Sequence, residues 1–573
     1  MLEQQRTPSS AEPVQGFRDG TEALAATVGP AVPQSEALVS QSPSPDSRPA
    51  PWRKRRLSGA YRDPFIWVTS LAVFCACLAI SLFRLLQLNP SSWDLAIYTE
   101  YVKQVAGWHA PVADVRTAGF NLLGDHFQPI VMMIAPFFRV FPSAATLVAV
   151  QALLAALSVF AVSQAAREKF GRFGVGPSRA IAVAYGFSWG LQQLANFDFH
   201  EIAFAVPLLA FSLSALVRGR IKAAVWWALP LVFVKEDQGF TVAAIGLYLA
   251  IAGMRVAARE PAAGEPAAGE PAAPGAAVTS ADPDGRRRIK AGQVLLIWGF
   301  AWSFLAIGVI IPHFNPAHQY DYWSDGGILA SGGHPTVAGL IGQFFHAWPD
   351  KLQTIVILLL PTAFIALRSP LVLIAGPSLL LRFLSTNASF WGTYWHYNAT
   401  VMPIIFIAAI DAMARINAAM DAEDPAGYAS WASGSRGTRR AVMAGARRYG
   451  AAMMLAITVA LAFQFPLSTV WNAQSYQISR HVKSADAAMA KVPDGVTVQA
   501  TLDLLAPLAA RTDTFWIGNS GNPKTQYIVF DSLNSDYSPA ISNVPAFIAQ
   551  LYPGHSYTQI FQSGDVYVFR RTT

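Results

Sequence analysis

The feature that most constrains this chain is a series of long apolar runs separated by short polar connections. The first run, Phe65–Leu86, is long enough to cross the hydrocarbon core of a bilayer as a helix. It is also too long, and lies too far along the chain, to be a cleaved signal peptide. Only 13% of the residues are charged and 53% are hydrophobic, whereas about a quarter of the residues of a soluble domain are charged. The sequence therefore predicts a polytopic membrane protein.

Further apolar runs predict an α-helical protein with about eleven transmembrane helices in all. They lie near residues 145–166, 178–195, 202–217, 222–234, 239–254, 294–312, 353–367, 370–384, 399–415 and 449–466. The basic cluster Arg53–Arg56 precedes the first run and predicts a cytoplasmic N-terminus, because Lys and Arg are retained on the inner side. If successive spans cross the membrane in alternate directions from this start, most later basic clusters lie on the inner side and all ten His lie on the outer side. Since these bases flank apolar runs, the net charge of +7 sets orientation and does not predict nucleic acid as a partner.

The parts outside the apolar runs predict the domain organisation. Residues 1–60 are rich in Pro, Ser, Ala and Gln and predict a disordered cytoplasmic tail. Residues 61–467 form the predicted transmembrane domain, with outer loops 87–144 and 313–352 and a low-complexity cytoplasmic linker at 256–290. A loop as long as the second one is usually functional or a lid. The apolar segment Pro129–Phe141 is too short to span and predicts an interfacial helix on the outer face.

Residues 468–573 have a different character and predict a small extracytoplasmic α/β domain. Short β-like runs occur at Val496–Ala500, Thr514–Gly518 and Gln526–Asp531. The pair 557–561 and 566–570, joined by Ser-Gly-Asp, predicts a hairpin, and helical patterns lie at 484–491 and 502–510.

Four polar clusters on the predicted outer side are candidates for function, because charge beside a membrane span is costly to retain. They contain Asp94; Asp125 and His126; Asp198, His200 and Glu201; and Lys235, Glu236 and Asp237. Arg382 and the aromatic run that contains Tyr394, Trp395 and His396 extend this set.

Each cluster also has an ordinary structural explanation. Asp94 could cap the helix that follows it, and Asp125 and His126 could form a solvated turn. The cluster from Asp198 to Glu201 could be a cap or an interface, and Lys235–Asp237 a turn whose charges satisfy one another. The aromatic run could be an interfacial belt. The position of all these groups on one predicted side of the membrane favours a shared site.

The order of these clusters resembles a family. The matching strings are WDLAIYTEYV, LLGDHFQPI, FDFHEIAFAVPLLAF and VKEDQGF. They resemble the bacterial membrane-protein family DUF2079 over roughly residues 60–415, and the C-terminal domain is also similar. At a greater distance the plan is similar to GT-C glycosyltransferases, such as the aminoarabinose and protein mannosyltransferases. Those enzymes have an acidic residue in the first outer loop and use polyprenyl-phosphate-linked sugars.

The resemblance implies roles for individual residues. Asp94 matches the first-loop acid, which serves as general base or contacts metal and acceptor. Lys235 stands near a phosphate-binding Lys of the GT-C pattern, but Glu236 and Asp237 depart from that pattern and suit a divalent cation or a second base. Arg382 is a further candidate for the phosphate, with Tyr394, Trp395 and His396 as a substrate platform. Asp125, His126, Asp198, His200 and Glu201 have side chains that suit a divalent metal ion.

The predicted function is therefore a GT-C-like glycosyltransferase on the outer face of the bacterial plasma membrane, with membrane lipids and a polyprenyl-phosphate sugar donor as partners. Two alternatives remain open: a transporter or flippase of a lipid or envelope precursor, and a non-catalytic envelope scaffold. The centres of the predicted spans are almost free of charge, which disfavours an ion-coupled transporter.

Overall fold

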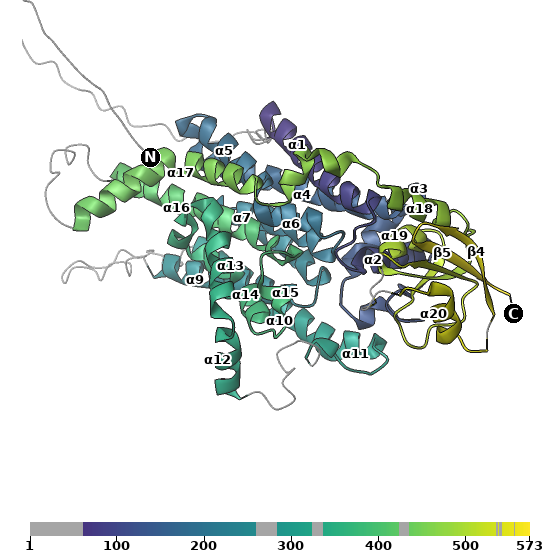
Figure 1. Ribbon diagram of the computed structural model, residues 1–573. Helices are drawn as coiled ribbons and strands as arrows, with labels where there is room; N and C mark the ends of the chain where they lie inside the picture. Colours follow the sequence, from purple (N-terminus) through teal and green to yellow (C-terminus); the bar gives the residue numbers. More distant parts are fainter. Residues whose placement is uncertain are drawn as a thin grey trace, which may run out of the picture. The chain divides into compact units, whose positions relative to one another are not determined.

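The structure is a computed structural model that describes residues 61–258, 283–323, 336–422, 435–534, 537, 541–554 and 556–572. The predicted tail 1–60, most of the linker 256–290 and part of the outer loop 313–352 lie outside the described residues. The described residues are mostly helical, and a small sheet lies near the C-terminus (Figure 1).

The helices before the sheet region carry the labels α1 to α17. Their bounds are α1 (Pro64–Leu86), α2 (Asp94–Ala106), α3 (Ala135–Val140), α4 (Ala144–Phe170), α5 (Gly176–Gly186), α6 (Trp189–Asn196), α7 (Ala205–Val217), α8 (Ile221–Ala228), α9 (Gln238–Ala257), α10 (Pro283–Leu305), α11 (Ile311–Phe314), α12 (Val337–Phe345), α13 (Trp348–Leu359), α14 (Gly376–Phe383), α15 (Ala388–Trp391), α16 (Val401–Ala422) and α17 (Ser435–Ala462). Short 3-10 helices extend or join several of them, and a π-helical segment, Ala306–Ile310, joins α10 to α11.

Five helical segments in the described part of the chain are long and apolar enough to cross a membrane. They are Pro64–Leu86, Ala144–Phe173, Gln238–Ala257, Asp284–Phe314 and Val401–Asp421. Shorter apolar helical segments lie at Pro129–Val140, Glu201–Val217, Ile221–Phe233 and Pro370–Phe383. The chain is thus a multi-pass membrane protein, while the number of about eleven spans stays a prediction.

Two predicted spans are not continuous helices. The run 178–195 is divided between α5 and α6, which are separated by Phe187 and Ser188. The run 353–367 is interrupted where Ala363 and Phe364 have φ values of 48° and 59°. This left-handed conformation is unfavourable for residues with a Cβ atom and ends the regular helical path.

Helices α9 and α10 form an antiparallel pair whose backbones approach closely at glycines. A Cβ atom added at Gly239 would lie 2.3 Å from the carbonyl oxygen of Gly299, and one at Gly246 would lie 2.6 Å from that of Gly292. The third pair is Gly253 with Gly285, at 2.7 Å. Glycines recur every seven residues on both helices, so each pair lies on the shared face, as is common where membrane helices pack through small residues.

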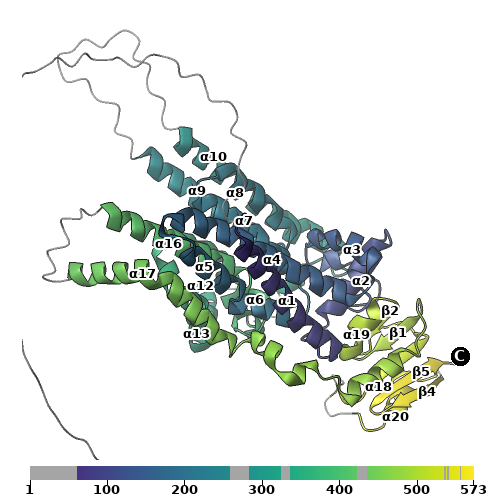
Figure 2. The same cartoon turned by 90° about the horizontal axis from the view of Figure 1, so that it is seen from above.

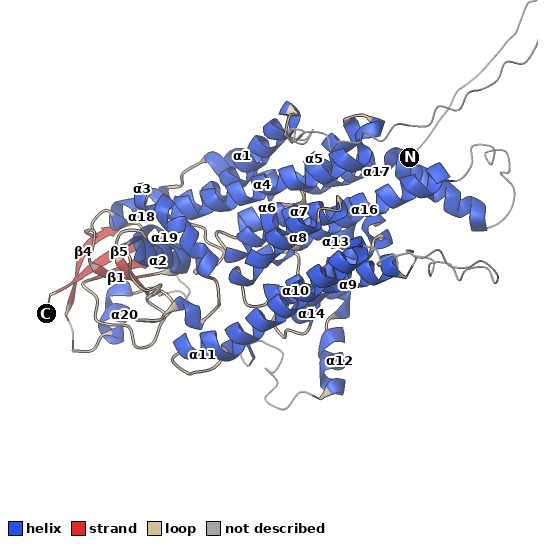
Figure 3. Cartoon of the chain, turned by 180° about the vertical axis from the view of Figure 1, so that it is seen from behind, coloured by secondary structure: helices blue, strands red, loops and turns tan. Residues whose placement is uncertain are grey.

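The C-terminal region is a five-stranded sheet with helices around it (Figure 3). The strands are β1 (Thr497–Ala500), β2 (Asp513–Trp516), β3 (Tyr527–Asp531), β4 (Tyr557–Ser563) and β5 (Val566–Arg571), in the order β2-β1-β3-β5-β4. The helices are α18 (Arg480–Met489), α19 (Leu502–Ala509) and α20 (Val544–Leu551). Strand β1 is parallel to both β2 and β3, and β4 and β5 form an antiparallel hairpin. The predicted strands, hairpin and two helices of this region are confirmed.

The C-terminal region packs against α2 through α19 (Figure 2). The Lys103 ammonium donates to the carbonyl oxygen of Thr512 at 2.6 Å, and the rings of Trp93 and Trp516 meet edge to face with centroids 5.0 Å apart. The Asn519 amide donates to the carbonyl oxygen of Val115 at 2.9 Å. These contacts hold α2, the helix that begins with Asp94, against the sheet region.

Candidate active site

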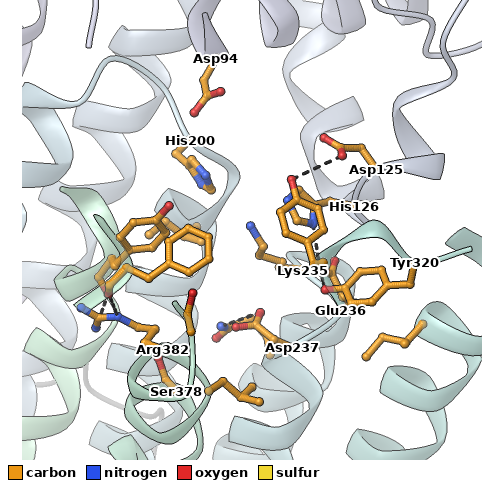
Figure 4. A pocket seen from close by; sticks show the side chains of 18 of the residues that line it. Asp94, Asp125, His126, His200, Lys235, Glu236, Asp237, Tyr320, Ser378 and Arg382 are labelled. Atoms are coloured by element: carbon orange, nitrogen blue, oxygen red, sulfur yellow. Dashed lines mark hydrogen bonds and ion pairs between the residues drawn. The ribbon is translucent and has the colours of Figure 1, made fainter. Parts of the chain in front are cut away.

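The four predicted polar clusters meet at one cavity of about 480 Å³. The predicted site residues that line it are Asp94, Asp125, His126, His200, Lys235, Glu236, Asp237 and Arg382. They come from the start of α2, the segment before α3, the connection between α6 and α7, the segment before α9, and α14 (Figure 4). Sequence reasoning therefore identified a set of residues that the fold does bring together.

Asp94 is the first residue of α2, and its carboxylate faces the cavity (Figure 4). Asp94 does not cap this helix, because the N-cap residue of α2 is Trp93 and no side-chain cap hydrogen bond forms there. Asp198 accepts from the amides of Ser91 and Ser92, just before the helix, at 2.7 and 3.3 Å. Burial raises the pKa of Asp94, and the negative charge of Glu201 adds to this effect. A raised pKa makes the carboxylate a stronger base.

Glu201 lies behind the cavity wall, fully buried, and pairs with several partners. One carboxylate oxygen is 2.9 Å from the Lys235 ammonium, and the other is 2.7 Å from Nδ1 of His200 and accepts from the Tyr98 hydroxyl. Burial alone would lower the pKa of Lys235, but neighbouring carboxylates, Glu201 first, raise it, so the ammonium stays charged. These contacts fix one cation and one imidazole at the cavity wall.

Glu236 is the centre of a second buried group of contacts. Its carboxylate lies 2.8 Å from Nδ1 of His126 and accepts from the amide of Phe127 at 3.1 Å and from the Tyr320 hydroxyl at 2.9 Å. Burial would raise the pKa of Glu236, but His126 and Lys235 lower it to about 2. Both oxygens are engaged and the group is a weak base, so these contacts favour a positioning role over the predicted catalytic one.

Asp237, the neighbour of Glu236, lines the cavity with few partners. Its carboxylate accepts from the Gln238 side chain at 3.2 Å (Figure 4). Burial raises the pKa of Asp237, and the charge of Lys235 opposes this effect. Asp94 and Asp237 are therefore the two predicted catalytic acids whose carboxylates remain suited to act on a bound molecule.

Arg382 lines the cavity, but its guanidinium is held by the segment that follows α14. It donates to the carbonyl oxygens of Phe390 and Tyr397, at 2.6 and 3.3 Å, and to the Asn398 side chain at 2.9 Å. These bonds fix the 390–398 segment, and they place the side chains of Phe390 and Tyr397 at the cavity.

The three residues predicted as a substrate platform, Tyr394, Trp395 and His396, do not line the cavity. Tyr394 is 59% exposed, and Trp395 packs against Phe197 with centroids 5.1 Å apart. His396 is buried and stacks on His200 with centroids 3.8 Å apart. Burial lowers the pKa of His396, so its imidazole is neutral at pH 7. No pattern in this run indicates which of its aromatic residues turn toward the cavity.

The cavity residues that were not predicted from the sequence include Arg116, Tyr320 and Tyr322. The Arg116 guanidinium lies 4.0 Å from the Asp125 carboxylate and 5.6 Å from the centre of the Trp93 ring. Tyr322 stacks on His126 with centroids 4.4 Å apart and donates to Asp125 at 3.4 Å. The two tyrosines belong to the outer loop that was predicted to be functional, and their position in that loop was the sequence feature that could have identified them.

The start of that loop is held against the segment that carries Asp125. The Asn315 amide donates to the carbonyl oxygen of Gly124 at 3.0 Å. A Cβ atom at Gly124 would lie 2.6 Å from the backbone of Phe314 and Asn315. Only glycine permits this approach, so Gly124 is required for the start of the loop to lie against this segment.

The five residues predicted to bind a metal ion do not form one ligand group. Asp198 lies outside the cavity, where it also contacts Arg84 at 3.7 Å, and the oxygens of Glu201 are taken by its partners. Within the described residues, three ligand atoms within 4.8 Å of one another occur at His481, Asp503 and Asp531 in the C-terminal region. Asp125, His126 and His200 line the cavity, and metal binding there stays a prediction.

Fold and site together define a multi-pass membrane protein with a polar cavity among its helices. A family model described as "Predicted membrane protein (DUF2079)" matches residues 84–553. The chain belongs to this family, as its four motifs indicated. A comparison with curated protein sequences gives no significant match.

Comparison with solved structures finds a similar overall path in two crystal structures of ArnT from Cupriavidus metallidurans. For the structure bound to undecaprenyl phosphate, the TM-score is 0.47 at 13% identity, covering 89% of this chain and 98% of that one. For the apo state, the TM-score is 0.43 at 12% identity, covering 89% and 97%. A structural similarity of this extent does not indicate an activity.

Proposed function

We propose that this protein is a membrane glycosyltransferase that takes its sugar from a polyprenyl-phosphate carrier on the outer face of the bacterial plasma membrane. One observation carries the proposal: a single cavity is lined by carboxylates, by cations and by apolar side chains of membrane helices. This combination suits a substrate that has a charged headgroup and a hydrocarbon tail.

The apolar part of the lining suits the isoprenoid tail. Phe240 comes from α9, Phe304 from α10, Ile307 from the π-helical segment and Leu381 from α14. Phe304 is 64% exposed, so this part of the lining reaches the outer surface of an apolar helix. A lipid tail could leave the cavity there and remain in the bilayer.

The cations of the cavity suit the carrier phosphate. Lys235 is held at the wall by Glu201 and keeps its charge, and Arg116 has a weaker contact at 4.0 Å with Asp125. Both could stabilise the charge that develops on the leaving phosphate. Arg382 supports the cavity wall through its bonds to the 390–398 segment.

The proposed reaction is the transfer of the sugar from phosphate to a hydroxyl group of an acceptor. The acceptor oxygen forms a bond to the anomeric carbon while the bond from that carbon to the phosphate oxygen breaks. The polyprenyl phosphate leaves with the electron pair, and the Asp94 carboxylate takes the proton of the hydroxyl group. The raised pKa of Asp94 supports this assignment. Asp237 is the second candidate for the same role.

The test is sugar transfer by the purified protein in lipid vesicles, with radiolabelled polyprenyl-phosphate sugars as donors. We expect Asp94→Asn to lower the rate by about 10²- to 10⁴-fold, the contribution of a positioned general base. Asp494→Asn is the matched control, because this side chain is 79% exposed and lies in the C-terminal region. Transfer by Asp94→Asn at the wild-type rate would remove Asp94 as the base.

A second outcome separates the enzyme from a transporter. If the wild type transfers sugar from no donor but moves labelled lipid-phosphate sugar across the vesicle membrane, the flippase alternative replaces the proposal. Reporter fusions test the orientation, because the proposal requires Asp94 and the C-terminal region on the outer side.

A further inference from the structure

A second group of polar residues lies in the C-terminal region, at the edge of its sheet. Asp503 is in the first turn of α19, which follows β1, and Asp531 is the last residue of β3. His481 is in the first turn of α18. Since β1 and β3 are parallel, their carboxyl ends lie at the same edge.

This edge is where a sheet of this topology binds ligands. The connection that follows β1 leads to β2 on one side, whereas the connection that follows β3 leads to β4 at the opposite edge of the sheet. The connections after the adjacent parallel strands β1 and β3 therefore leave in opposite directions. Ligands of open α/β sheets bind in the crevice that such a switch creates outside the carboxyl ends of the strands.

The three side chains converge tightly. One ligand atom of each lies within 4.8 Å of the others, and Nε2 of His481 is 2.6 Å from Oδ2 of Asp531. Asp531 is fully buried, Asp503 is 5% exposed, and the His481 side chain is 17% exposed.

In Asp503 and in Asp531, one carboxylate oxygen accepts a hydrogen bond from a neighbouring residue, and the other oxygen faces the cluster of His481, Asp503 and Asp531. Oδ1 of Asp531 accepts from the amide of Leu533 at 2.9 Å, and Oδ1 of Asp503 accepts from the Thr501 hydroxyl at 2.9 Å. Oδ2 of Asp503 is buried without a hydrogen-bond donor among the described residues. The ion pair found for these two acids within the described residues is the one between Asp531 and His481. Two buried carboxylates that face each other need a proton or a cation between them.

We propose that His481, Asp503 and Asp531 bind a divalent transition-metal ion of the Zn²⁺ type. One imidazole nitrogen and two carboxylate oxygens are ligands that zinc accepts, and the imidazole disfavours Mg²⁺ and Ca²⁺, which prefer oxygen. The site is separate from the cavity that contains Asp94, so it does not depend on the proposed transferase activity.

The geometry leaves room for a fourth ligand. An open cleft of about 890 Å³ is lined by His481 and Asp503, and by Asn534 beside them. Residues 87–90, which follow α1, also line this cleft. Three protein ligands with an open fourth position are typical of zinc sites that bind water or a substrate oxygen.

The test is zinc binding by the full-length protein in detergent, measured by metal analysis after removal of metal with a chelator and addition of Zn²⁺. We expect one zinc per chain to be lost in both His481→Asn and Asp503→Asn. Two matched controls should keep it: His109→Asn, which changes an exposed histidine, and Asp494→Asn, which changes an exposed acid of the same region.

Thermal unfolding gives a second readout that separates binding from misfolding. Zinc should raise the Tm of the wild type and the controls and leave that of His481→Asn unchanged. Two results would overturn the proposal. One is a wild type that takes up no zinc together with an Asp503→Asn variant whose Tm is higher than that of the wild type. This result would show that the two acids share a proton. The other is full zinc binding by both variants, because the ion then binds elsewhere.

Discussion

The acids around the cavity fall into two regions that use the same functional group differently. In the buried network, formed by Glu201 and Glu236, each carboxylate is held by a cation or imidazole and by a hydroxyl group. The cavity-facing acids, Asp94 and Asp237, have few protein partners and pKa values raised by burial. The network lowers the pKa of Glu236 to about 2. Paired carboxylates thus build the wall, and weakly paired ones are suited to chemistry.

This difference predicts opposite effects of mutation. Removing a paired, buried carboxylate leaves its partner charged and unsatisfied, so the main loss is stability. Removing a cavity-facing carboxylate relieves the cost of its burial, so the main loss is activity.

The largest effect is expected for Glu201→Ala. Lys235, whose side chain is 15% exposed, would lose its fully buried partner at 2.9 Å, and breaking a buried pair costs about 3–5 kcal/mol of unfolding free energy. Denaturant unfolding in detergent measures this loss. The matched control is Asp494→Ala, which removes an acid 79% exposed and paired with Arg511, itself 31% exposed, and there we expect a loss of about 0–1 kcal/mol. Equal losses in the two variants would contradict the distinction.

Glu236→Gln is expected to have the next largest effect. Hydrogen bonds to a charged group contribute about 1.5–3 kcal/mol, and the amide cannot accept all the bonds made by the carboxylate. The folded-state pKa of Glu236 is depressed to about 2 from 4.5. Its contribution is therefore present above pH 4.5 and is lost as the pH falls toward 2. Unfolding measured across this range should show a smaller decrease for the variant, and parallel profiles would argue against the paired state.

Tyr320→Phe tests the edge of the same network. Loss of its hydrogen bond of 2.9 Å to Glu236 should lower the unfolding free energy by about 1 kcal/mol. Tyr394→Phe is the control, because this ring is 59% exposed and does not line the cavity. A Tm that falls as much in the control as in Tyr320→Phe would show that the hydroxyl group at position 320 is not part of the network.

The smallest effect on stability is expected for Asp94→Asn and Asp237→Asn. Burial raises the pKa of both acids, so the folded state disfavours their charged forms, and a neutral amide should change the unfolding free energy by less than about 0.5 kcal/mol or increase it. Thermal unfolding of the two variants checks this. A loss as large as that of Glu201→Ala would place these acids in the buried network.

The sequence predicted the site better than it predicted individual roles. The four motifs are polar segments next to apolar runs. They meet at one cavity because they lie at the same end of the helices. The role of each carboxylate could not be predicted from the sequence, because it depends on contacts with residues distant in the chain. Glu201 meets Lys235, and Asp198 meets Ser91, only after the helices have packed. Arg116 was missed for the same reason.

The fold shows a similar limit. The apolar runs identified most helices, but hydropathy does not record backbone conformation, so the interruption at Ala363 and Phe364 was not visible. The glycines of α9 and α10 recur at seven-residue spacing, and this signal for a close helix pair could have been used. The group formed by His481, Asp503 and Asp531 could not be predicted, because parallel strand pairing brings these residues together.

The most direct test of the central claim is the pH dependence of kcat/KM for sugar transfer from a polyprenyl-phosphate donor. If Asp94 is the base, the wild-type rate should fall tenfold per pH unit below a pKa that lies above the usual value for aspartate of about 3.9. That acid limb should be absent from the residual activity of Asp94→Asn. The account would be contradicted if the variant kept the same acid limb and a rate within about threefold of the wild type, since a positioned base contributes at least 10²-fold.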